Sequence, residues 1–206
     1  MSSSKYLALP IVSLDAYAVD LNEGYGVKND VIVSQILEYG ALVDPEAAML
    51  HDHSHTYYED WRLPDTDEVN HLKATVTDVM SEIAGRPYTI TESWSIVLEP
   101  GQSVAAHSHY VHGAINPNEY FAFAYYPFAP EGSVPLQILG THSNVISSTI
   151  SAPVSTGTLL IFNSYLLHWT NRQIVDSIRV NVSGNLAPVN PTTVSNDDWS
   201  KYKKES

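Results

Sequence analysis

The sequence predicts an α+β protein that is mainly β, with its strands in a sandwich or jelly roll and helices packed on the outside of one sheet. Two observations support this prediction. The apolar pattern has a helical period before Pro87 and a period of two after it. The later part also has short apolar runs with turn-forming residues at roughly every tenth position, as sandwiches do. No repeat, low-complexity segment or linker is visible, so we expect one domain over residues 1–206.

The composition narrows the function classes. The chain is 44% hydrophobic and 16% charged, which is typical of a globular protein. Its formal net charge of −13 argues against nucleic-acid binding, because that relies on Lys and Arg to neutralise phosphates. There is no cysteine, which excludes disulfides and thiolate metal sites. The sequence shows neither the apolar core of a signal peptide nor an apolar run of roughly 20 residues, so we expect no membrane association.

The first part of the chain, about 1–87, is expected to be helical and irregular and to support the strands. A helix is predicted over 67–84, because its apolar residues form a single stripe. Asp65 or Thr66 could cap its start, and Gly85 ends it. A shorter helix is predicted at about 30–39. The stripe of the longer helix consists of Val69, Leu72, Val76, Val79, Met80 and Ile83.

The second part, about 88–188, is expected to form the strand core, followed by a short tail at 189–206. Four segments there alternate with a period of two or are continuously apolar: 93–98, 121–126, 158–162 and 178–183. Pro127 and Pro130 are expected to stop the second of them, because proline cannot donate a hydrogen bond to a neighbouring strand.

The last of these segments has the most informative polarity. Ile178, Val180 and Val182 face one way and should pack on a core. The other face bears Arg179, followed by an amide and a hydroxyl. A buried arginine needs an anionic partner, and a carboxylate matches its planar fork best. Arg179 is therefore a candidate for binding a carboxylate co-substrate.

Three histidines are candidate metal ligands. His107 and His109 form an HSH pair, and residues at i and i+2 of a strand face the same side. His168 follows the apolar segment 158–162 and is the natural third ligand. Neutral imidazole suits iron, zinc, copper and nickel alike, so the histidines alone do not name the metal.

Other histidines receive a weaker interpretation. His51, His53 and His55 resemble a metal motif but precede the strand core, and we expect a polar loop near the site entrance. His71 falls on the surface of the longer helix. His142 lies in a polar loop and is assigned no role.

Taken together, these segments resemble a known family. The stretch 94–188 resembles the double-stranded β-helix core of iron(II)/2-oxoglutarate-dependent oxygenases. More narrowly, it is similar to a prolyl-hydroxylase-like family frequent in bacteriophage genomes. The resemblance covers a little under half of the chain and rests on the HSH pair, the aromatic strand 120–127, the run 157–168 ending in His168, and the segment 179–185.

The resemblance implies roles for individual residues. His107 and His168 would bind Fe(II), and Arg179, helped by Asn181, would bind the C5 carboxylate of 2-oxoglutarate. Three positions depart from the family pattern. His109 stands where the superfamily has Asp or Glu, although the narrower family often shows this HxH. Asn163 replaces a usual Pro, and Asn181 replaces a frequent Ser.

The third metal ligand therefore stays open at this point. His109 is one candidate, giving a three-histidine site. Glu119, His112 or water are the alternatives.

The activity implied by the resemblance is oxidative decarboxylation of 2-oxoglutarate to succinate, coupled to C–H hydroxylation. The partners would be O2 and a small-molecule or peptide side-chain substrate, and a homodimer is possible for such proteins. The expected location is the cytoplasm, that of the host if the protein is phage-encoded.

Two other functions compete with this one. A cupin-type metalloenzyme shares the spacing of Gly101 to the HSH pair and of Gly157 to His168. It would need a glutamate four or five residues after His109, where Gly113 and Ala114 stand, and it has no need for the arginine. A metal-free jelly-roll binding or structural protein would instead show neither metal affinity nor a response to 2-oxoglutarate.

Overall fold

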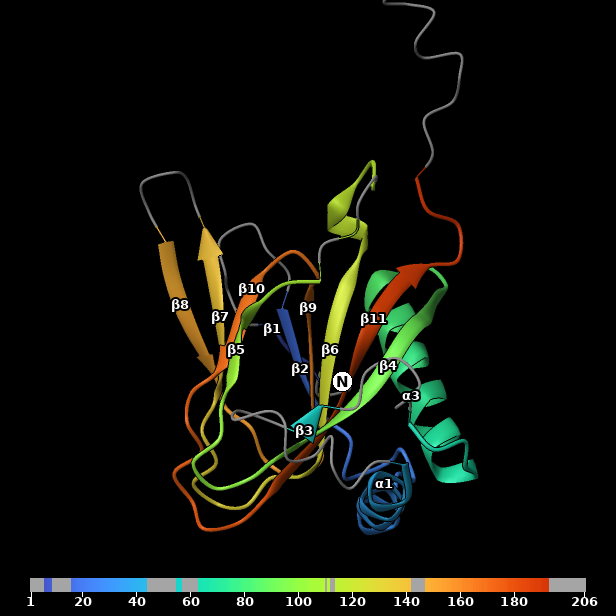
Figure 1. The fold of residues 1–206 in the computed structure, drawn as a ribbon. Coiled ribbons are helices and arrows are strands. Elements are labelled where there is room, and N and C mark those ends of the chain that lie inside the picture. The colour runs from blue at the N-terminus through green and yellow to red at the C-terminus, as the bar shows by residue number, and fades with distance from the viewer. Residues whose placement is uncertain are drawn as a thin grey trace, which may run out of the picture.

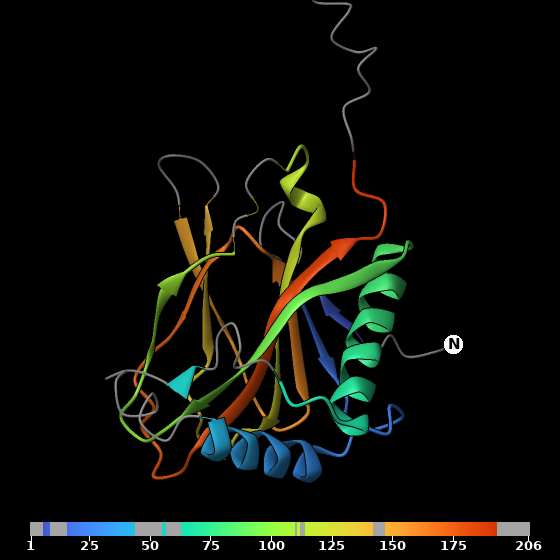
Figure 2. The ribbon, with the colours of Figure 1, turned by 45° about the vertical axis from the view of Figure 1, so that its right-hand side comes forward.

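The structure is a computed structural model that describes residues 6–8, 16–43, 55–56, 63–109, 111, 114–141 and 147–192. Two antiparallel sheets face each other, and two helices cover the outer face of the larger sheet (Figure 1). Turning the molecule shows both helices on the side of that sheet away from the smaller one (Figure 2).

The larger sheet has seven strands in the order β1-β2-β9-β6-β11-β4-β3. Their bounds are β1 Tyr6–Ala8, β2 Ala16–Asp20, β3 His55–Thr56, β4 Tyr88–Leu98, β6 Phe121–Phe128, β9 Thr158–Asn163 and β11 Arg179–Pro188. The smaller sheet has four strands in the order β5-β10-β7-β8. Their bounds are β5 Val104–His107, β7 Leu136–Thr141, β8 Ser147–Ala152 and β10 Leu167–Thr170.

The path of the chain through these sheets is that of a double-stranded β-helix. From β4 to β11 the chain passes back and forth between the sheets, with β7 and β8 as one hairpin inside the smaller sheet. The four strands β9, β6, β11 and β4 of the larger sheet then lie opposite β8, β7, β10 and β5. The predicted fold class, a mainly β jelly roll with outer helices, is confirmed.

Helix α3 (Asp67–Ala84) has the predicted bounds. The Thr66 side chain accepts a hydrogen bond from the Val69 amide at 3.3 Å, and Gly85 closes the helix in the left-handed conformation. Asp67 and Glu68 in the first turn also oppose the positive end of the helix dipole. The described helices include none that is long and apolar enough to cross a bilayer.

The early part of the chain contributes strands as well as helices to the fold. Helix α1 runs over Asn29–Val43, longer than the predicted 30–39. The strands β1, β2 and β3 were not predicted, and they extend both edges of the larger sheet. Strand β2 pairs with β9 over five residue pairs, so residues before the predicted core complete the sheet.

Pro127 does not stop its strand, contrary to the prediction. Strand β6 continues to Phe128 because its register against β11 shifts there: Val182 pairs with Tyr125, whereas Val180 pairs with Phe128. The extra residue forms a bulge, the place in a sheet where a proline without an N–H is tolerated.

The larger sheet separates two buried cores. The core on its helix side contains aliphatic and aromatic residues from the sheet and both helices, among them Ile32, Leu72, Val76, Ile161 and Val182. The core between the two sheets is smaller and contains several alanines, together with Tyr126, Leu136, Ile138, Leu160 and Phe162.

Strand β11 contributes to both sides of this division. Val180 and Val182 lie in the helix-side core, as the alternation predicted. Arg179, Asn181 and Ser183 are buried on the opposite face, between the sheets. The polar face of the last strand is therefore interior and not exposed to solvent.

Candidate metal and co-substrate site

The three candidate histidines lie together at one end of the space between the sheets. His107 ends β5 and pairs with His168 of β10. His109 lies just after β5, where its backbone N–H donates to the Ser164 carbonyl at 2.7 Å. This bond holds the segment after β5 against the turn that leads into β10. Together with the strand pairing it brings His107 and His168, 61 positions apart in sequence, side by side.

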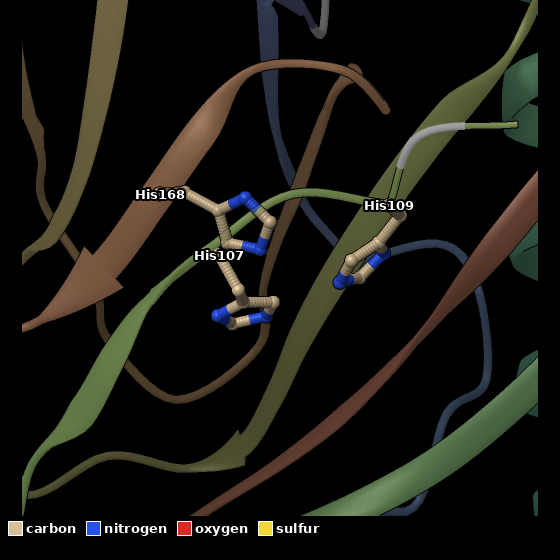
Figure 3. Close-up of side chains that lie close together, drawn as sticks. All are labelled: His107, His109 and His168. Atoms are coloured by element: carbon tan, nitrogen blue, oxygen red, sulfur yellow. The ribbon is translucent and has the colours of Figure 1, made fainter.

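The imidazoles are arranged as a metal site would require. One ring nitrogen of each can be chosen so that all three lie within 4.8 Å of one another. The ring centroids of His107 and His168 are 4.3 Å apart, and those of His109 and His168 are 4.9 Å apart. Figure 3 shows the rings turned toward a common space from two neighbouring segments. No other such group occurs among the described residues.

Hydrogen bonds fix which nitrogen of each ring has a free lone pair that could bind a metal ion. The Nδ1 of His107 lies 2.8 Å from the Ala105 carbonyl oxygen, and that of His168 lies 2.9 Å from the Leu166 carbonyl oxygen. The Nδ1 of His109 lies 2.7 Å from Oδ1 of Asn185. A carbonyl or amide oxygen can only accept, so each Nδ1 carries the proton and each Nε2 keeps its lone pair. Metal-binding histidines are commonly oriented in this way.

The electrostatics keep two of these rings neutral. Burial, reinforced by the nearby His107, lowers the pKa of His109 to about 4. The same two causes lower the pKa of His168 to about 3. Neutral imidazole is the form that binds metals, so both rings are ready to bind at neutral pH.

The structure does not bring Glu119, an alternative third ligand, to the histidines. Its carboxylate accepts hydrogen bonds from the backbone and side chain of Thr192 and pairs with Arg86 at 3.1 Å. These contacts, those with Thr192 first, lower the pKa of Glu119. Glu119 thereby anchors the chain just after β11.

The remaining histidines do not join the group. The alternative ligand His112 lies outside the described residues, as do His51, His53 and His142. Of His55 only the backbone is described: it lies in β3 and pairs with Val97 of β4. His71 lies exposed on α3, as predicted, with Nε2 2.8 Å from the Tyr25 carbonyl oxygen.

Arg179 lies in the same pocket as the histidines and is only 1% exposed. Its guanidinium donates to the Val134 carbonyl at 2.9 Å and to the Thr170 hydroxyl at 3.1 Å. It also lies over the Tyr126 ring, 5.3 Å from the centroid. Burial lowers the pKa of Arg179 from its ordinary value, and it also raises that of the Tyr126 phenol.

Arg179 has no ionic partner in the part of the chain that the structure describes. Among the described residues no carboxylate lies within 4.0 Å of the guanidinium, and its Nε is buried without a hydrogen-bond partner. A buried charge without an ionic partner is costly. A guanidinium in this setting can accept an anion with a planar pair of acceptor oxygens.

The three histidines and Arg179 line the same pocket. It lies between the sheets and holds about 420 Å³ of space outside protein atoms, including its open mouth. The three histidines, Arg179, Asn181 and Ser183 line it, with apolar walls from Trp94, Ile96, Val104, Leu136 and Phe162. Asn181 donates to the Ser183 hydroxyl at 2.8 Å, so its contact is with the next polar residue of β11.

Sequence reasoning missed three residues that contact the candidate site. Thr170 binds Arg179, Tyr126 lies beneath it, and Asn185 binds His109. A period of two along the strands would have found two of them. Thr170 follows His168 by two residues on β10, and Asn185 continues the series of Arg179, Asn181 and Ser183 on β11.

Solved structures with the same fold include proteins described as α-ketoglutarate-dependent or solved with 2-oxoglutarate. The carbocyclase SnoK from nogalamycin biosynthesis, described as non-haem and α-ketoglutarate-dependent, has a TM-score of 0.62 at 11% identity and covers 86% of this chain and 90% of its own. HygX from Streptomyces hygroscopicus was solved with nickel, 2-oxoglutarate and hygromycin B. It has a TM-score of 0.58 at 15% identity and covers 84% of this chain and 83% of its own.

A viral protein also shares the fold. The collagen prolyl hydroxylase vCPH from Paramecium bursaria Chlorella virus-1, solved as a 2-oxoglutarate complex, has a TM-score of 0.56 at 14% identity and covers 85% of this chain and 96% of its own. At such identities the likeness shows the fold alone. No protein-family model matches the chain, and no curated protein matches its sequence.

Proposed function

We propose that this protein is an Fe(II)- and 2-oxoglutarate-dependent oxygenase that hydroxylates a C–H bond of its substrate. One observation supports this above the others: a three-imidazole group and a buried arginine, which has no anionic partner among the described residues, lie in the same pocket of a double-stranded β-helix. The imidazole group can hold a metal ion. The arginine can hold the far carboxylate of a dicarboxylate that is bound to this metal ion.

His107, His109 and His168 would hold the iron. The donor set fits, because three neutral imidazoles with available Nε2 atoms suit Fe(II). When bound, iron and 2-oxoglutarate supply the oxidation, in which one atom of O2 enters succinate, with loss of CO2, and the other enters the hydroxylated product.

Arg179 would bind the C5 carboxylate of 2-oxoglutarate. The incoming oxygens would satisfy the free Nε and neutralise the guanidinium, while Thr170 and the Val134 carbonyl hold the guanidinium in place. Asn181 and Ser183 would offer further polar contacts along β11. The apolar walls, including Phe162 and Trp94, would keep bulk water from the reacting groups.

The rival functions explain fewer of these contacts. A cupin-type metalloenzyme would use the three histidines but leave Arg179 buried with no anion to bind. A metal-free jelly roll would leave both the arginine and the converging imidazole lone pairs without a role. The likeness to HygX and vCPH, each solved with 2-oxoglutarate, supports the oxygenase in preference to both.

For the primary substrate we propose a small molecule or a peptide side chain. Neighbours in both classes share the fold: HygX was solved with hygromycin B, and vCPH is a collagen prolyl hydroxylase. The narrower likeness to prolyl hydroxylases of phage type and the homodimer remain predictions.

Thermal unfolding under anaerobic conditions tests this function. A ligand that binds only the folded protein raises the melting temperature by mass action. Fe(II) should raise it, and 2-oxoglutarate should raise it further only when metal is present. In Arg179→Met the metal effect should persist and the 2-oxoglutarate effect should disappear, whereas exposed Arg172→Met should behave as wild type. A metal effect without a 2-oxoglutarate effect in the wild type would favour the cupin, and no effect of either would favour a metal-free protein.

A further inference from the structure

The Asn185 side chain lies between His109 and a carboxylate. Its Oδ1 is 2.7 Å from Nδ1 of His109, and its Nδ2 donates to Oε2 of Glu92 at 3.3 Å. Glu92 of β4 is the direct cross-strand partner of Asn185 of β11. The two contacts use opposite ends of one amide, so they agree on its orientation: the carboxylate takes the N–H end and the imidazole faces the oxygen.

The backbone around this pair is adapted to bring it together. The β4–β11 register shifts directly after Asn185, since Asn185 pairs with Glu92 and Leu186 pairs with Ile90. Gly184 lets the strands approach closely, because a Cβ there would lie 2.4 Å from the Glu92 carbonyl oxygen. Bulges and glycines of this kind commonly re-aim side chains beside functional sites.

His109 differs from the other two histidines in how it is oriented. His107 and His168 each donate from Nδ1 to a backbone carbonyl two residues earlier in the chain, in Ala105 and Leu166. His109 lies beyond the end of β5 and has a side chain as its acceptor. Its ring is therefore the one of the three that a side chain orients in place of a backbone carbonyl.

We propose that Asn185, oriented by Glu92, is a positioning residue that holds His109 in the Nδ1–H tautomer with Nε2 toward the metal. This inference rests on the proposed function, since it assigns a role within the same metal site. It makes Glu92, Asn185 and His109 one hydrogen-bonded chain from the surface to the pocket. The Asn185 oxygen accepts the proton of His109 Nδ1, and the Glu92 carboxylate accepts the Asn185 amide N–H.

The first test needs only the wild-type protein without metal. Nitrogen-15 NMR of the imidazoles distinguishes the two neutral tautomers, and the inference predicts Nδ1–H for His109 in the folded protein near neutral pH. An Nε2–H signal for His109 would overturn the inference, whatever the variants do.

The second test uses Co(II) as the probe, with affinity measured by competition against a chromophoric chelator. Asn185→Leu keeps the size but removes the acceptor, and we expect Co(II) affinity to fall roughly 10- to 100-fold, as is usual when a partner of a metal ligand is lost. Asn185→Asp supplies an acceptor again but lacks the N–H that Glu92 accepts, so its affinity should lie between those of wild type and Asn185→Leu. Glu92→Ala should cause a smaller loss of several fold, which Glu92→Gln should largely avoid. Exposed Glu82→Ala on α3 is the matched control.

A spectroscopic reading separates positioning from general damage. In the Co(II) protein each ligand histidine with a protected Nδ1–H gives one shifted exchangeable proton resonance, so we expect three in wild type and in Asn185→Asp. In Asn185→Leu one of them should be lost to exchange with water while two remain. Three resonances and unchanged affinity in Asn185→Leu would overturn the inference and leave the proposed function intact. Failure of the wild type to bind Co(II) would overturn both.

Discussion

The two faces of the larger sheet bury different kinds of residue. The helix-side face is aliphatic and aromatic and packs on α1 and α3. The inner face carries small side chains such as Ala122 and Ala124, and beside them Arg179, Asn181 and Ser183. Strand β11 places successive residues on the two faces, with Val180 and Val182 on one and the polar series on the other.

We infer from this difference that the helix-side face stabilises the fold and that the inner face serves ligand binding. Burying apolar surface on the helix side stabilises the fold, because each buried aliphatic side chain contributes about 1.5–3 kcal/mol. The inner face does the opposite, since it removes from water a guanidinium that has no ionic partner among the described residues. We therefore expect substitutions on the helix side to change unfolding free energy, and substitutions on the inner face to change ligand binding.

The largest effect should come from opening the helix-side core. Leu72 on α3 is fully buried, so Leu72→Ala should lower the unfolding free energy by about 2–5 kcal/mol through lost burial and a cavity. Urea denaturation measures this. Co(II) affinity of the folded variant should stay at the wild-type value. A stability loss below about 1 kcal/mol, or a selective loss of Co(II) binding, would contradict the division.

A pH effect of a few kcal/mol should come from the inner face. The folded-state pKa values of His109 and His168 are about 4 and about 3, below the ordinary value of 6.5 that applies when the chain unfolds. Between these values the unfolded chain binds more protons, so the stability of the metal-free protein is complete above pH 6.5 and falls as the pH drops toward 4. Each unit of pKa difference corresponds to about 1.4 kcal/mol.

Urea denaturation from pH 7 to pH 4.5 measures this loss. His168→Gln removes one of the two groups and should make the loss shallower, whereas exposed His71→Gln should leave it unchanged. The explanation fails if His168→Gln loses stability as steeply as wild type.

A smaller effect, about 1–3 kcal/mol, is expected from Gly184→Ala. The added Cβ would lie 2.4 Å from the Glu92 carbonyl oxygen and 2.6 Å from Cε1 of Phe123, so the strands must separate. Gly101→Ala is the comparison: nothing lies within 4 Å of its Cβ, and only the positive φ of 82° opposes it, at a cost of roughly 1 kcal/mol. Chemical denaturation should rank Gly184→Ala as the more damaging; the reverse order would show that the close approach is relaxed easily.

The smallest change in stability should follow removal of the buried charge. Arg179→Met exchanges an uncompensated guanidinium for an apolar chain of similar length, against the loss of two hydrogen bonds. We expect the metal-free variant to be at least as stable as wild type by urea denaturation. A loss of more than about 1 kcal/mol would mean that Arg179 serves the fold, and the division between the two faces would not hold for it.

Much of this architecture was predictable from local signals. The helix over 67–84 was found at its true ends because Thr66 and Gly85 mark them chemically. Helix α1 was predicted too short: Gly40, a residue type that often ends helices, follows residue 39, yet the helix continues through it to Val43. The strand through Pro127 was cut short because a bulge depends on the register of the neighbouring strand, which no local pattern contains.

The site was predictable in its parts but not in its connections. The histidine spacing and the polarity of the segment 178–183 were enough to single out His107, His109, His168 and Arg179. That Arg179 has no carboxylate near it among the described residues depends on the packing of β7 and β10 around it. The Glu92–Asn185 pair depends on a cross-strand register, so sequence alone could not join it to His109.

The most direct test of the proposed site is an anaerobic titration of 2-oxoglutarate into the Fe(II)-loaded protein, followed by visible absorption. If the three histidines hold the iron and Arg179 holds the distant carboxylate, a weak metal-to-ligand charge-transfer band should grow to saturation in the wild type. It should require far more 2-oxoglutarate in Arg179→Met and no more than wild type in Arg172→Met. Iron binding without this band, or a band that does not depend on Arg179, would contradict the account.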